Sequence, residues 1–190
     1  MEKREFLFKS AAAVGAGAFL LAGCTTTPFA PAKSPAEKRQ DIDARVTATL
    51  ERMYTTVPGS RELASRAEGV LVFPSVIAAG FVVGGQVGDG ALRVAGQTVD
   101  YYTTVTGSFG LQIGAQSKAI IFLFMTQEAL NKFRNSNGWT AGVDASVAVL
   151  KVGVNGTLDT SPEPVNVIIL TNQGLMAGVS VEGTKVTKMK

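Results

Sequence analysis

Ala119-Ile120-Ile121-Phe122-Leu123-Phe124-Met125 is an unbroken apolar run, and it decides the fold that the sequence predicts. A half-buried strand alternates apolar and polar side chains, so a continuous apolar run is typical of a strand that is buried on both faces. This run is the most aggregation-prone part of the chain, and Lys118 places a charge directly before it. We therefore expect a strand here that is covered on both faces.

The chain before this run has the two-residue period of β-strands, with glycine at every few positions. An apolar strand is expected at residues 70–73, and Pro74 should end it. The Asp89-Gly90 pair predicts a hairpin turn, because a type I′ turn needs positive φ at both central positions. Residues 91–95 should therefore return as a strand, and residues 98–105 should form the next one.

The chain after the run begins with a short helix and then returns to strands. Thr126 should cap a helix over residues 127–134. Apolar side chains then occupy odd positions over residues 143–149 and even positions over residues 150–154. This change of face predicts a β-bulge near residues 148–150.

Residues 34–54 have the pattern of an amphipathic helix. Ser34-Pro35-Ala36-Glu37 is a helix start, with Ser at the N-cap, Pro in the first turn and Glu positioned to close a capping box. Apolar side chains follow at helical spacing, at Ile42, Val46, Leu50, Met53 and Tyr54. Val57-Pro58-Gly59 should end this helix, and Ser60 should cap a short second helix that reaches about residue 67.

The sequence ends in a hairpin, which completes the expected fold. Strands are expected at residues 165–170 and 175–181, joined by a turn at residues 171–174. Because strand follows strand through short turns, the sheet should be largely antiparallel. The predicted fold class is α+β, with a strongly curved, barrel-like, glycine-rich sheet packed by the N-terminal amphipathic helix and short flanking helices.

The first residues have the three-part layout of a signal peptide. A charged segment with Lys3 and Arg4 precedes an uncharged stretch over residues 11–22, which is shorter than the roughly 20 residues of a spanning helix. Leu21-Ala22-Gly23-Cys24 follows and resembles the lipobox of bacterial lipoproteins. That resemblance implies diacylation of the Cys24 sulfur, cleavage on its amino side and acylation of the new amine. The charged segment also resembles a twin-arginine signal with Lys in place of the first Arg, so both export routes stay open.

Cleavage before Cys24 would divide the chain into a signal peptide over residues 1–23, a lipidated tether over residues 24–33 and a domain over residues 34–190. Cys24 is the only cysteine, so an internal disulfide is excluded. Two or more acyl chains of the palmitate type convert marginal membrane binding into stable anchoring. Thr25, in place of Asp, favours the outer membrane by resemblance to lipoprotein sorting. We expect an outer-membrane lipid anchor in the cell envelope, with the domain facing the periplasm.

The chain lacks the residues that most enzymes use. It has no histidine, which together with the single cysteine excludes Ser-His-Asp triads, cysteine nucleophiles in the domain, and zinc sites built from His or Cys. Asp100 and Asp144 lie in expected strands and are the remaining candidates for a general acid–base pair, but solvated strand faces normally carry such residues. Asp89 is better explained as a turn residue and Asp159 as a loop residue. We therefore expect no catalytic residue, no metal site, no cofactor and no enzymatic activity.

Composition and glycine spacing also argue against nucleotides and nucleic acid as partners. Residues 84–90 are glycine-rich, but they enter an expected hairpin, whereas a dinucleotide loop must lead into a helix. The chain has 18 basic and 15 acidic side chains. Cleavage before Cys24 would remove three basic and two acidic side chains and leave 15 against 13. So small an imbalance, without a clustered basic face, does not indicate nucleic acid.

Three glycine-spaced segments go beyond a generic sheet pattern. They are Ala79-Gly80-Phe81-Val82-Val83-Gly84-Gly85 with Gly88 and Gly90, Gly107-Ser108-Phe109-Gly110-Leu111-Gln112-Ile113-Gly114-Ala115-Gln116, and Gly174-Leu175-Met176-Ala177-Gly178-Val179-Ser180-Val181-Glu182-Gly183. Their order and spacing resemble the SYLF domain family over roughly residues 39–185. Many members carry Trp-Ser-x-Pro before the second segment, whereas this chain has Thr98-Val99-Asp100-Tyr101-Tyr102.

The resemblance implies a domain that binds phosphoinositides and other acidic lipids, as in membrane-trafficking and actin-regulating proteins of eukaryotes. Membrane phospholipids, including acidic head groups, are therefore the expected partners. The C-terminal Lys185, Lys188 and Lys190 are the densest basic cluster and the candidate lipid-binding residues, and a solvated tail is the alternative explanation for them. The alternative function is a periplasmic envelope scaffold or surface antigen that binds a protein partner through the amphipathic helix.

Overall fold

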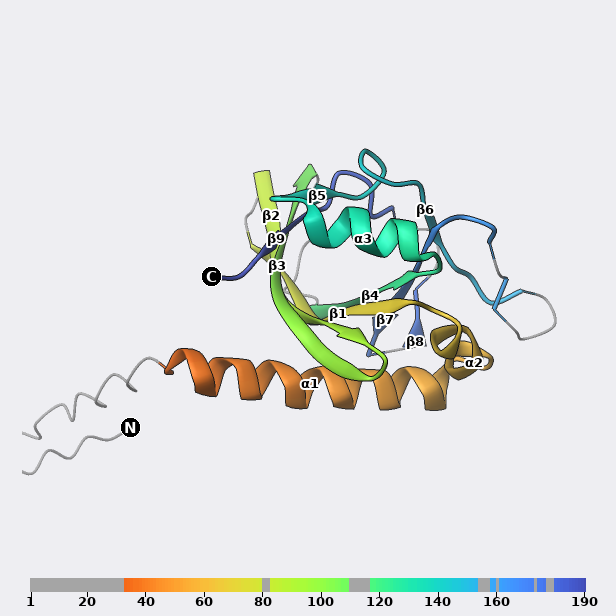
Figure 1. Ribbon diagram of the computed structural model, residues 1–190, viewed down its shortest axis with the longest axis horizontal. Helices are drawn as coiled ribbons and strands as arrows, with labels where there is room; N and C mark the ends of the chain where they lie inside the picture. Colours follow the sequence, from red (N-terminus) through yellow and green to blue (C-terminus); the bar gives the residue numbers. More distant parts are fainter. Residues whose placement is uncertain are drawn as a thin grey trace, which may run out of the picture. The chain divides into compact units, whose positions relative to one another are not determined.

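Nine strands and three helices make up the part of the chain that the structure describes (Figure 1). This computed structural model describes residues 33–79, 83–109, 117–153, 158–159, 161–172, 174–176 and 180–190. The helices are α1 (Pro35–Thr56), α2 (Ser60–Ser65) and α3 (Gln127–Asn135). The strands are β1 (Gly69–Ala79), β2 (Val83–Val94), β3 (Gln97–Phe109), β4 (Ser117–Phe124), β5 (Trp139–Thr140), β6 (Val147–Val149), β7 (Val165–Thr171), β8 (Gly174–Leu175) and β9 (Lys185–Lys188).

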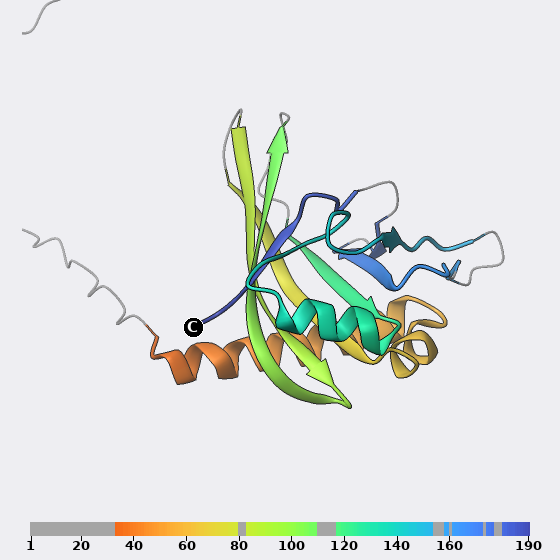
Figure 2. The ribbon, with the colours of Figure 1, turned by 45° about the horizontal axis from the view of Figure 1, so that its top comes forward.

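All nine strands belong to one strongly curled sheet. Their order is β5-β9-β3-β2-β1-β4-β7-β6, and β8 pairs with β7. The pairs are antiparallel except for β6, which runs parallel to β7. The sheet curls into a half-barrel, and β2 and β3 project beyond the other strands at one end (Figure 2). The predicted α+β class with a strongly curved, mostly antiparallel sheet is therefore confirmed.

Helix α1 begins with the capping box that the sequence predicts. The Ser34 N–H donates to Glu37 Oε2 at 2.8 Å, and the Glu37 N–H donates to Ser34 Oγ at 3.2 Å. These hydrogen bonds with Ser34 hold the pKa of the Glu37 carboxyl below its usual value. The apolar face of α1 is buried, with Val46 and Met53 fully inaccessible, because the helix lies along one face of the sheet. The described part of the chain contains no helix long and apolar enough to cross a membrane.

Strand β4 separates two hydrophobic clusters, as expected for a strand covered on both faces. Ile121 and Leu123 pack with α1 and α2, whereas Phe122 and Phe124 pack with α3 on the opposite face. Thr126 caps α3 as predicted, because its Oγ accepts from the Ala129 N–H at 3.2 Å. Aromatic rings fill the α3 side, where edge-to-face contacts join Trp139 to its neighbours Phe122, Phe124 and Phe133. Burial on both faces fixes β4 in the middle of the fold.

The predicted hairpin turn at Asp89-Gly90 is wrong, because both residues lie inside β2. Gly90 pairs with Tyr102 and passes so close to β1 that an added Cβ would lie 2.1 Å from the Val72 carbonyl oxygen. The glycine is therefore needed for close approach of two strands. The turn falls at Ala95-Gly96, whose φ values of 49° and 79° are both positive.

Two further predictions about strand and helix ends are corrected. Pro74 does not end β1, because a register shift between Phe73 and Val76 absorbs the residue that lacks an N–H. Ser60 does not cap α2: Gly59 occupies the N-cap, and α2 ends at Ser65. The Ser60 hydroxyl instead donates to the Met53 carbonyl of α1 at 3.0 Å and joins the two helices.

The last third of the chain is less regular than the sequence predicts. The expected strands over residues 143–149 and 150–154 reduce to β6 and an isolated bridge between Val152 and Leu158. The expected bulge near residues 148–150 is not found, because β6 ends at Val149. The hairpin at the end of β7 is confirmed, although β8 stops at Leu175. Strand β9, which the sequence analysis did not predict, covers the free edge of β3.

Candidate functional site

Three aliphatic side chains form an exposed row across β1, β2 and β3. Ile77 pairs with Val87, and Val87 pairs with Val105. Directly paired residues point to the same face of a sheet, so the three side chains lie next to one another. Their exposed fractions are 50%, 49% and 48%, respectively. We call Ile77, Val87 and Val105 the apolar row. Val87 lies near the start of β2 and Val105 near the end of β3, and these are the strand ends that project in Figure 2.

Polar residues continue the row at both ends. Lys185 of β9 pairs with Val105, and Ser117 of β4 pairs with Ile77. The Ser117 and Ser75 hydroxyls are hydrogen-bonded at 2.8 Å. Within the described residues, Lys185 has no carboxylate within ion-pair distance. One end of the row therefore carries an exposed ammonium group that is free to meet an anion.

A cleft of about 260 Å³ lies between the apolar row and the first half of α1. Ile77 and Val87 form its apolar wall, and the helix contributes Lys38 and Arg45. Both cations are balanced within the cleft, since Lys38 lies 2.8 Å from Asp89 and Arg45 lies 2.9 Å from Asp41. Both pairs are at least partly exposed to solvent, and pairs of this kind contribute little to stability.

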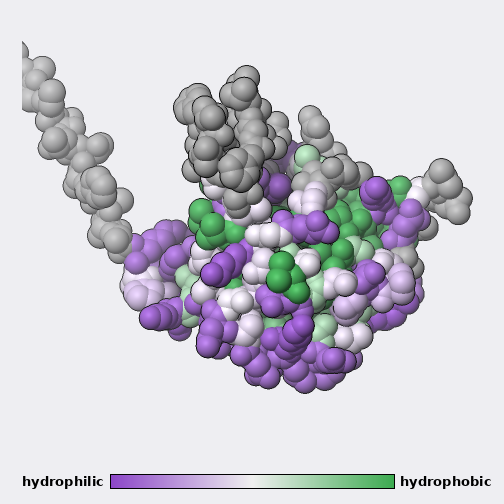
Figure 3. Space-filling model, turned by 90° about the horizontal axis from the view of Figure 1, so that it is seen from above, coloured by the Kyte–Doolittle hydropathy of each residue, from purple (hydrophilic) through white to green (hydrophobic). Residues whose placement is uncertain are grey.

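The apolar row is distinct from scattered exposure elsewhere on the molecule. Val143 is 77% exposed and Val99 is 40% exposed, but neither has an exposed large apolar partner across a described strand pair. The face seen from above shows hydrophobic side chains right of the middle, with hydrophilic ones around them (Figure 3). Single exposed apolar residues are ordinary on protein surfaces, whereas contiguous ones indicate a contact surface.

The structure separates the three lysines that the sequence analysis grouped. Lys185 lies on the α1 face beside the apolar row, whereas Lys188 pairs with Tyr102 and points to the opposite face. Lys188 forms an ion pair with Asp100 at 2.6 Å. Lys190 is the exposed C-terminal residue. Their role in lipid binding stays a prediction, and only Lys185 adjoins the apolar row.

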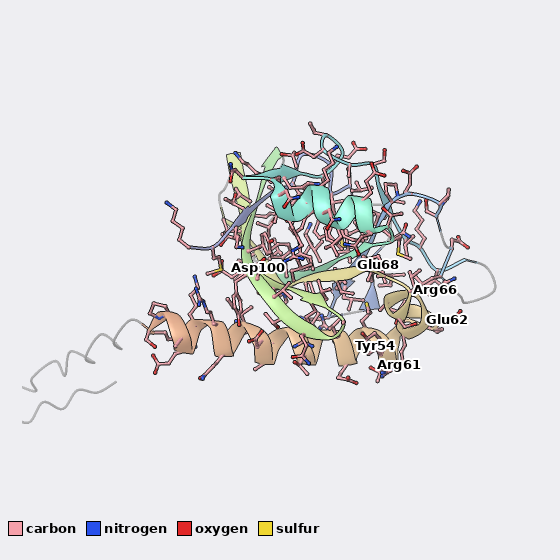
Figure 4. All side chains as sticks on the ribbon, in the orientation of Figure 1. Tyr54, Arg61, Glu62, Arg66, Glu68 and Asp100 are labelled. Atoms are coloured by element: carbon pink, nitrogen blue, oxygen red, sulfur yellow. The ribbon has the colours of Figure 1, made fainter. Side chains whose placement is uncertain are left out.

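The structure does not bring the acid–base candidates together. Asp100 lies on β3 (Figure 4) and is paired with Lys188. Asp144 lies in a turn, where its Oδ2 accepts from the Thr140 N–H at 2.6 Å, so its expected place in a strand is wrong. Asp89 accepts from Thr103 and Lys38 inside β2, and Asp159 follows the bridge residue Leu158. Among the described residues, no group of three acidic, His or Cys side chains could hold a metal ion.

Residues 98–102, which stand where many SYLF domains carry Trp-Ser-x-Pro, attach α1 to the sheet. The Tyr101 hydroxyl donates to Asp43 Oδ2 at 2.6 Å, and the Thr98 hydroxyl donates to Asp43 Oδ1 at 2.8 Å. Burial, together with the hydrogen bond to Asp43, raises the pKa of Tyr101 to about 12. Burial also raises the pKa of Tyr102 to about 12 and lowers the pKa of Lys118 at the start of β4. The first half of α1 is thereby fixed beside the cleft.

Sequence reasoning missed the apolar row because it misplaced the turn. A two-residue turn at Asp89-Gly90 would pair Val87 with Leu92, whereas the turn at Ala95-Gly96 pairs Val87 with Val105. The alternation of β2 and β3 was visible, so the missing information was the register. Cys24, the signal peptide, the tether as far as residue 32 and much of the three glycine-spaced segments lie outside the described residues.

Comparison with known proteins identifies the C-terminal part of the chain. Residues 105–190 match a family described as "Ysc84: Las17-binding protein actin regulator". No curated protein matches the chain. The match contains Val105, Lys185 and the last glycine-spaced segment, and such a domain suggests lipid-binding or actin-regulator-type function in a family that is generally non-enzymatic. Residues 105–190 therefore match the Ysc84 (SYLF) family, in agreement with the resemblance that the glycine-spaced segments suggested.

Proposed function

We propose that the protein is a membrane-anchored lipoprotein whose domain binds phospholipid surfaces through the apolar row and Lys185. The observation that carries this proposal is the row of three half-exposed aliphatic side chains that ends at a lysine without an ion-pair partner among the described residues. The family match supports a lipid-binding function. The aliphatic side chains would enter the boundary between head groups and acyl chains, and Lys185 would donate to a lipid phosphate.

The magnitudes favour weak binding that depends on an anchor. Complete burial of a Val or Ile side chain contributes about 1.5–3 kcal/mol, so three side chains that are already half-buried contribute about 1 kcal/mol each. A lysine near an acidic surface adds about 1 kcal/mol. The sum of a few kcal/mol gives reversible contact, and the acyl chains on Cys24 would supply the stable attachment.

The apolar face of α1 is not available for the membrane contact or the partner surface that its amphipathic pattern suggested. Its apolar residues pack against the sheet, and its outward face is charged. This burial removes the main argument for a scaffold that recruits a protein partner through the helix. The lipid contact is accordingly assigned to the sheet.

Lipidation at Cys24 and outer-membrane attachment, with the domain in the periplasm, complete the proposal. The lipobox-like Leu21-Ala22-Gly23-Cys24 supports it. Intact-mass spectrometry of the membrane-extracted chain should show loss of residues 1–23 and the added mass of acyl chains. The Cys24→Ala variant should leave the membrane fraction. If Cys24→Ala matures and partitions like the parent, lipid anchoring at this position is excluded.

Vesicle flotation of residues 33–190 tests the surface separately from the anchor. This segment should float with vesicles that contain acidic phospholipid more than with zwitterionic vesicles. Exchange of Val87 and Val105 for Ser should abolish flotation, and Lys185→Gln should weaken it on acidic vesicles alone. The matched control exchanges Val99 and Val143, which are exposed elsewhere, for Ser. Equal loss in both double variants would contradict the assignment.

A further inference from the structure

A second pocket lies at the other end of α1, away from the apolar row. It has a volume of about 430 Å³ and is enclosed by the second half of α1, helix α2 and the turn between β2 and β3. Leu50, Ala64 and Val70 give it an apolar wall. Two guanidinium groups, those of Arg61 and Arg93, line the same space together with the Glu51 carboxylate, which leaves one net positive charge.

Arg93 reaches from β2 to α1 and uses only part of its hydrogen-bonding capacity. Its Nη2 donates to Thr47 Oγ1 at 2.6 Å and to the Asp43 carbonyl oxygen at 3.4 Å. Its Nε is buried and has no hydrogen-bond partner within the described residues. No carboxylate of the described residues lies within ion-pair distance of Arg93. A buried charged donor without a partner is costly, so a ligand that accepts from it would gain affinity.

Arg61 brings the second positive charge to the pocket. Its guanidinium carbon lies 4.2 Å from the centre of the Tyr54 ring, and the two residues lie together where α1 meets α2 (Figure 4). Arg61 also forms an ion pair with Glu51 at 3.6 Å, but both side chains are more than 60% exposed, so this pair is weak. Burial raises the pKa of Tyr54, against the opposing effect of Arg61 and, to a smaller extent, Arg93. The phenol therefore stays neutral and can donate a hydrogen bond.

We propose that this pocket binds a small phosphomonoester, with its phosphate on Arg93 and Arg61 and its apolar substituent against Leu50, Ala64 and Val70. Guanidinium groups match phosphate because they offer parallel N–H donors to two oxygens. The volume falls within the range of small-molecule sites and exceeds what a bare phosphate fills. Asp43 does not compete for Arg93, since its carboxylate already accepts from Thr98 and Tyr101.

The test is calorimetric titration of the full chain with phenyl phosphate, with phenol as the ligand that lacks the phosphate. The parent should bind phenyl phosphate and not phenol. Arg93→Gln should weaken binding by about tenfold or more, and the exposed Arg61→Gln by about threefold. The matched control is Arg66→Gln, because Arg66 is the exposed C-cap residue of the same helix α2 and does not line the pocket.

The outcomes separate this site from the apolar row. Exchange of Val87 and Val105 for Ser should leave phenyl phosphate binding unchanged. The proposal for the apolar row and the proposal for the pocket are therefore tested independently. Vesicles with phosphatidic acid identify the source of the phosphate: weaker vesicle binding by Arg93→Gln indicates a lipid head group, and unchanged vesicle binding indicates a soluble ligand. The proposal is overturned if the parent does not bind phenyl phosphate, or if Arg61→Gln binds it as tightly as Arg66→Gln.

Discussion

The same three strands form one part that α1 covers and another part that it leaves open. In the covered part, Ala91 of β2 is fully buried, and its partner Tyr101 is hydrogen-bonded to α1. Four residues away on the same face of each strand, Val87 and Val105 are about half exposed. The alternation of side chains continues without a break in β2 and β3, whereas β1 has a register shift between Val72 and Ile77. The side chains of β2 and β3 therefore differ in burial because α1 packs over one part and not over the other.

This difference shows how a binding surface can arise from an ordinary core pattern. A helix that extended farther over the sheet would bury the apolar row. The contacts of Asp43 with Thr98 and Tyr101 hold α1 where it lies, so the row remains open. If this explanation is right, substitutions in the covered part should cost stability, and similar substitutions in the open part should not.

The largest expected effect is on the buried side of α1. Met53 is fully inaccessible, and Met53→Ala should lower the free energy of unfolding by about 2–5 kcal/mol through cavity formation. Val87→Ala in the open part should change it by less than about 0.5 kcal/mol. Urea unfolding of both variants measures the contrast. Similar losses would mean that the row belongs to the core.

A smaller contrast is expected between two glycines of β2. An added Cβ at Gly90 would lie 2.1 Å from the Val72 carbonyl oxygen, so Gly90→Ala should cost about 1–3 kcal/mol or more. At Gly85, in the open part, the closest described atom would lie 3.9 Å away, and Gly85→Ala should be neutral within about 0.5 kcal/mol. Thermal unfolding compares the two. Equal tolerance would contradict the close approach of β1 and β2.

The smallest expected effect is the pH dependence that Tyr101 adds in the covered part. The folded pKa of Tyr101 is raised to about 12, above the ordinary value of 10, so the folded state holds this proton more tightly. Stability from Tyr101 is therefore complete below pH 10 and is lost as pH rises toward 12. Tyr101→Phe should be less stable than the parent at neutral pH, because it loses the hydrogen bond to Asp43. Its free energy of unfolding should fall less than that of the parent as the pH rises from 10 to 12. An equal loss of stability in both proteins at alkaline pH would show that folding does not raise the pKa of Tyr101.

The sequence predicts those parts of the fold in which local pattern and burial agree. The apolar run of β4, the capping box at Ser34 and the Thr126 cap each depend on residues close together in the chain. The apolar row and the Arg93 pocket depend on strand register and on where α1 lies, which no local pattern specifies. Asp89-Gly90 shows this limit, because its glycine serves a contact with β1 and not a turn. Of the three grouped lysines, only Lys185 joins the row, since strand alternation sends Lys188 to the other face.

The most direct test of the membrane-contact surface is a fluorophore placed in the apolar row. Residues 33–190 contain no cysteine, so Val87→Cys gives a single labelling site, and Val143→Cys gives an equally simple control. An environment-sensitive fluorophore at residue 87 should shift to the blue and become accessible to lipid-borne quenchers when acidic vesicles are added. The same fluorophore at residue 143 should not change. Binding to vesicles without a spectral change at residue 87 would contradict the proposed surface.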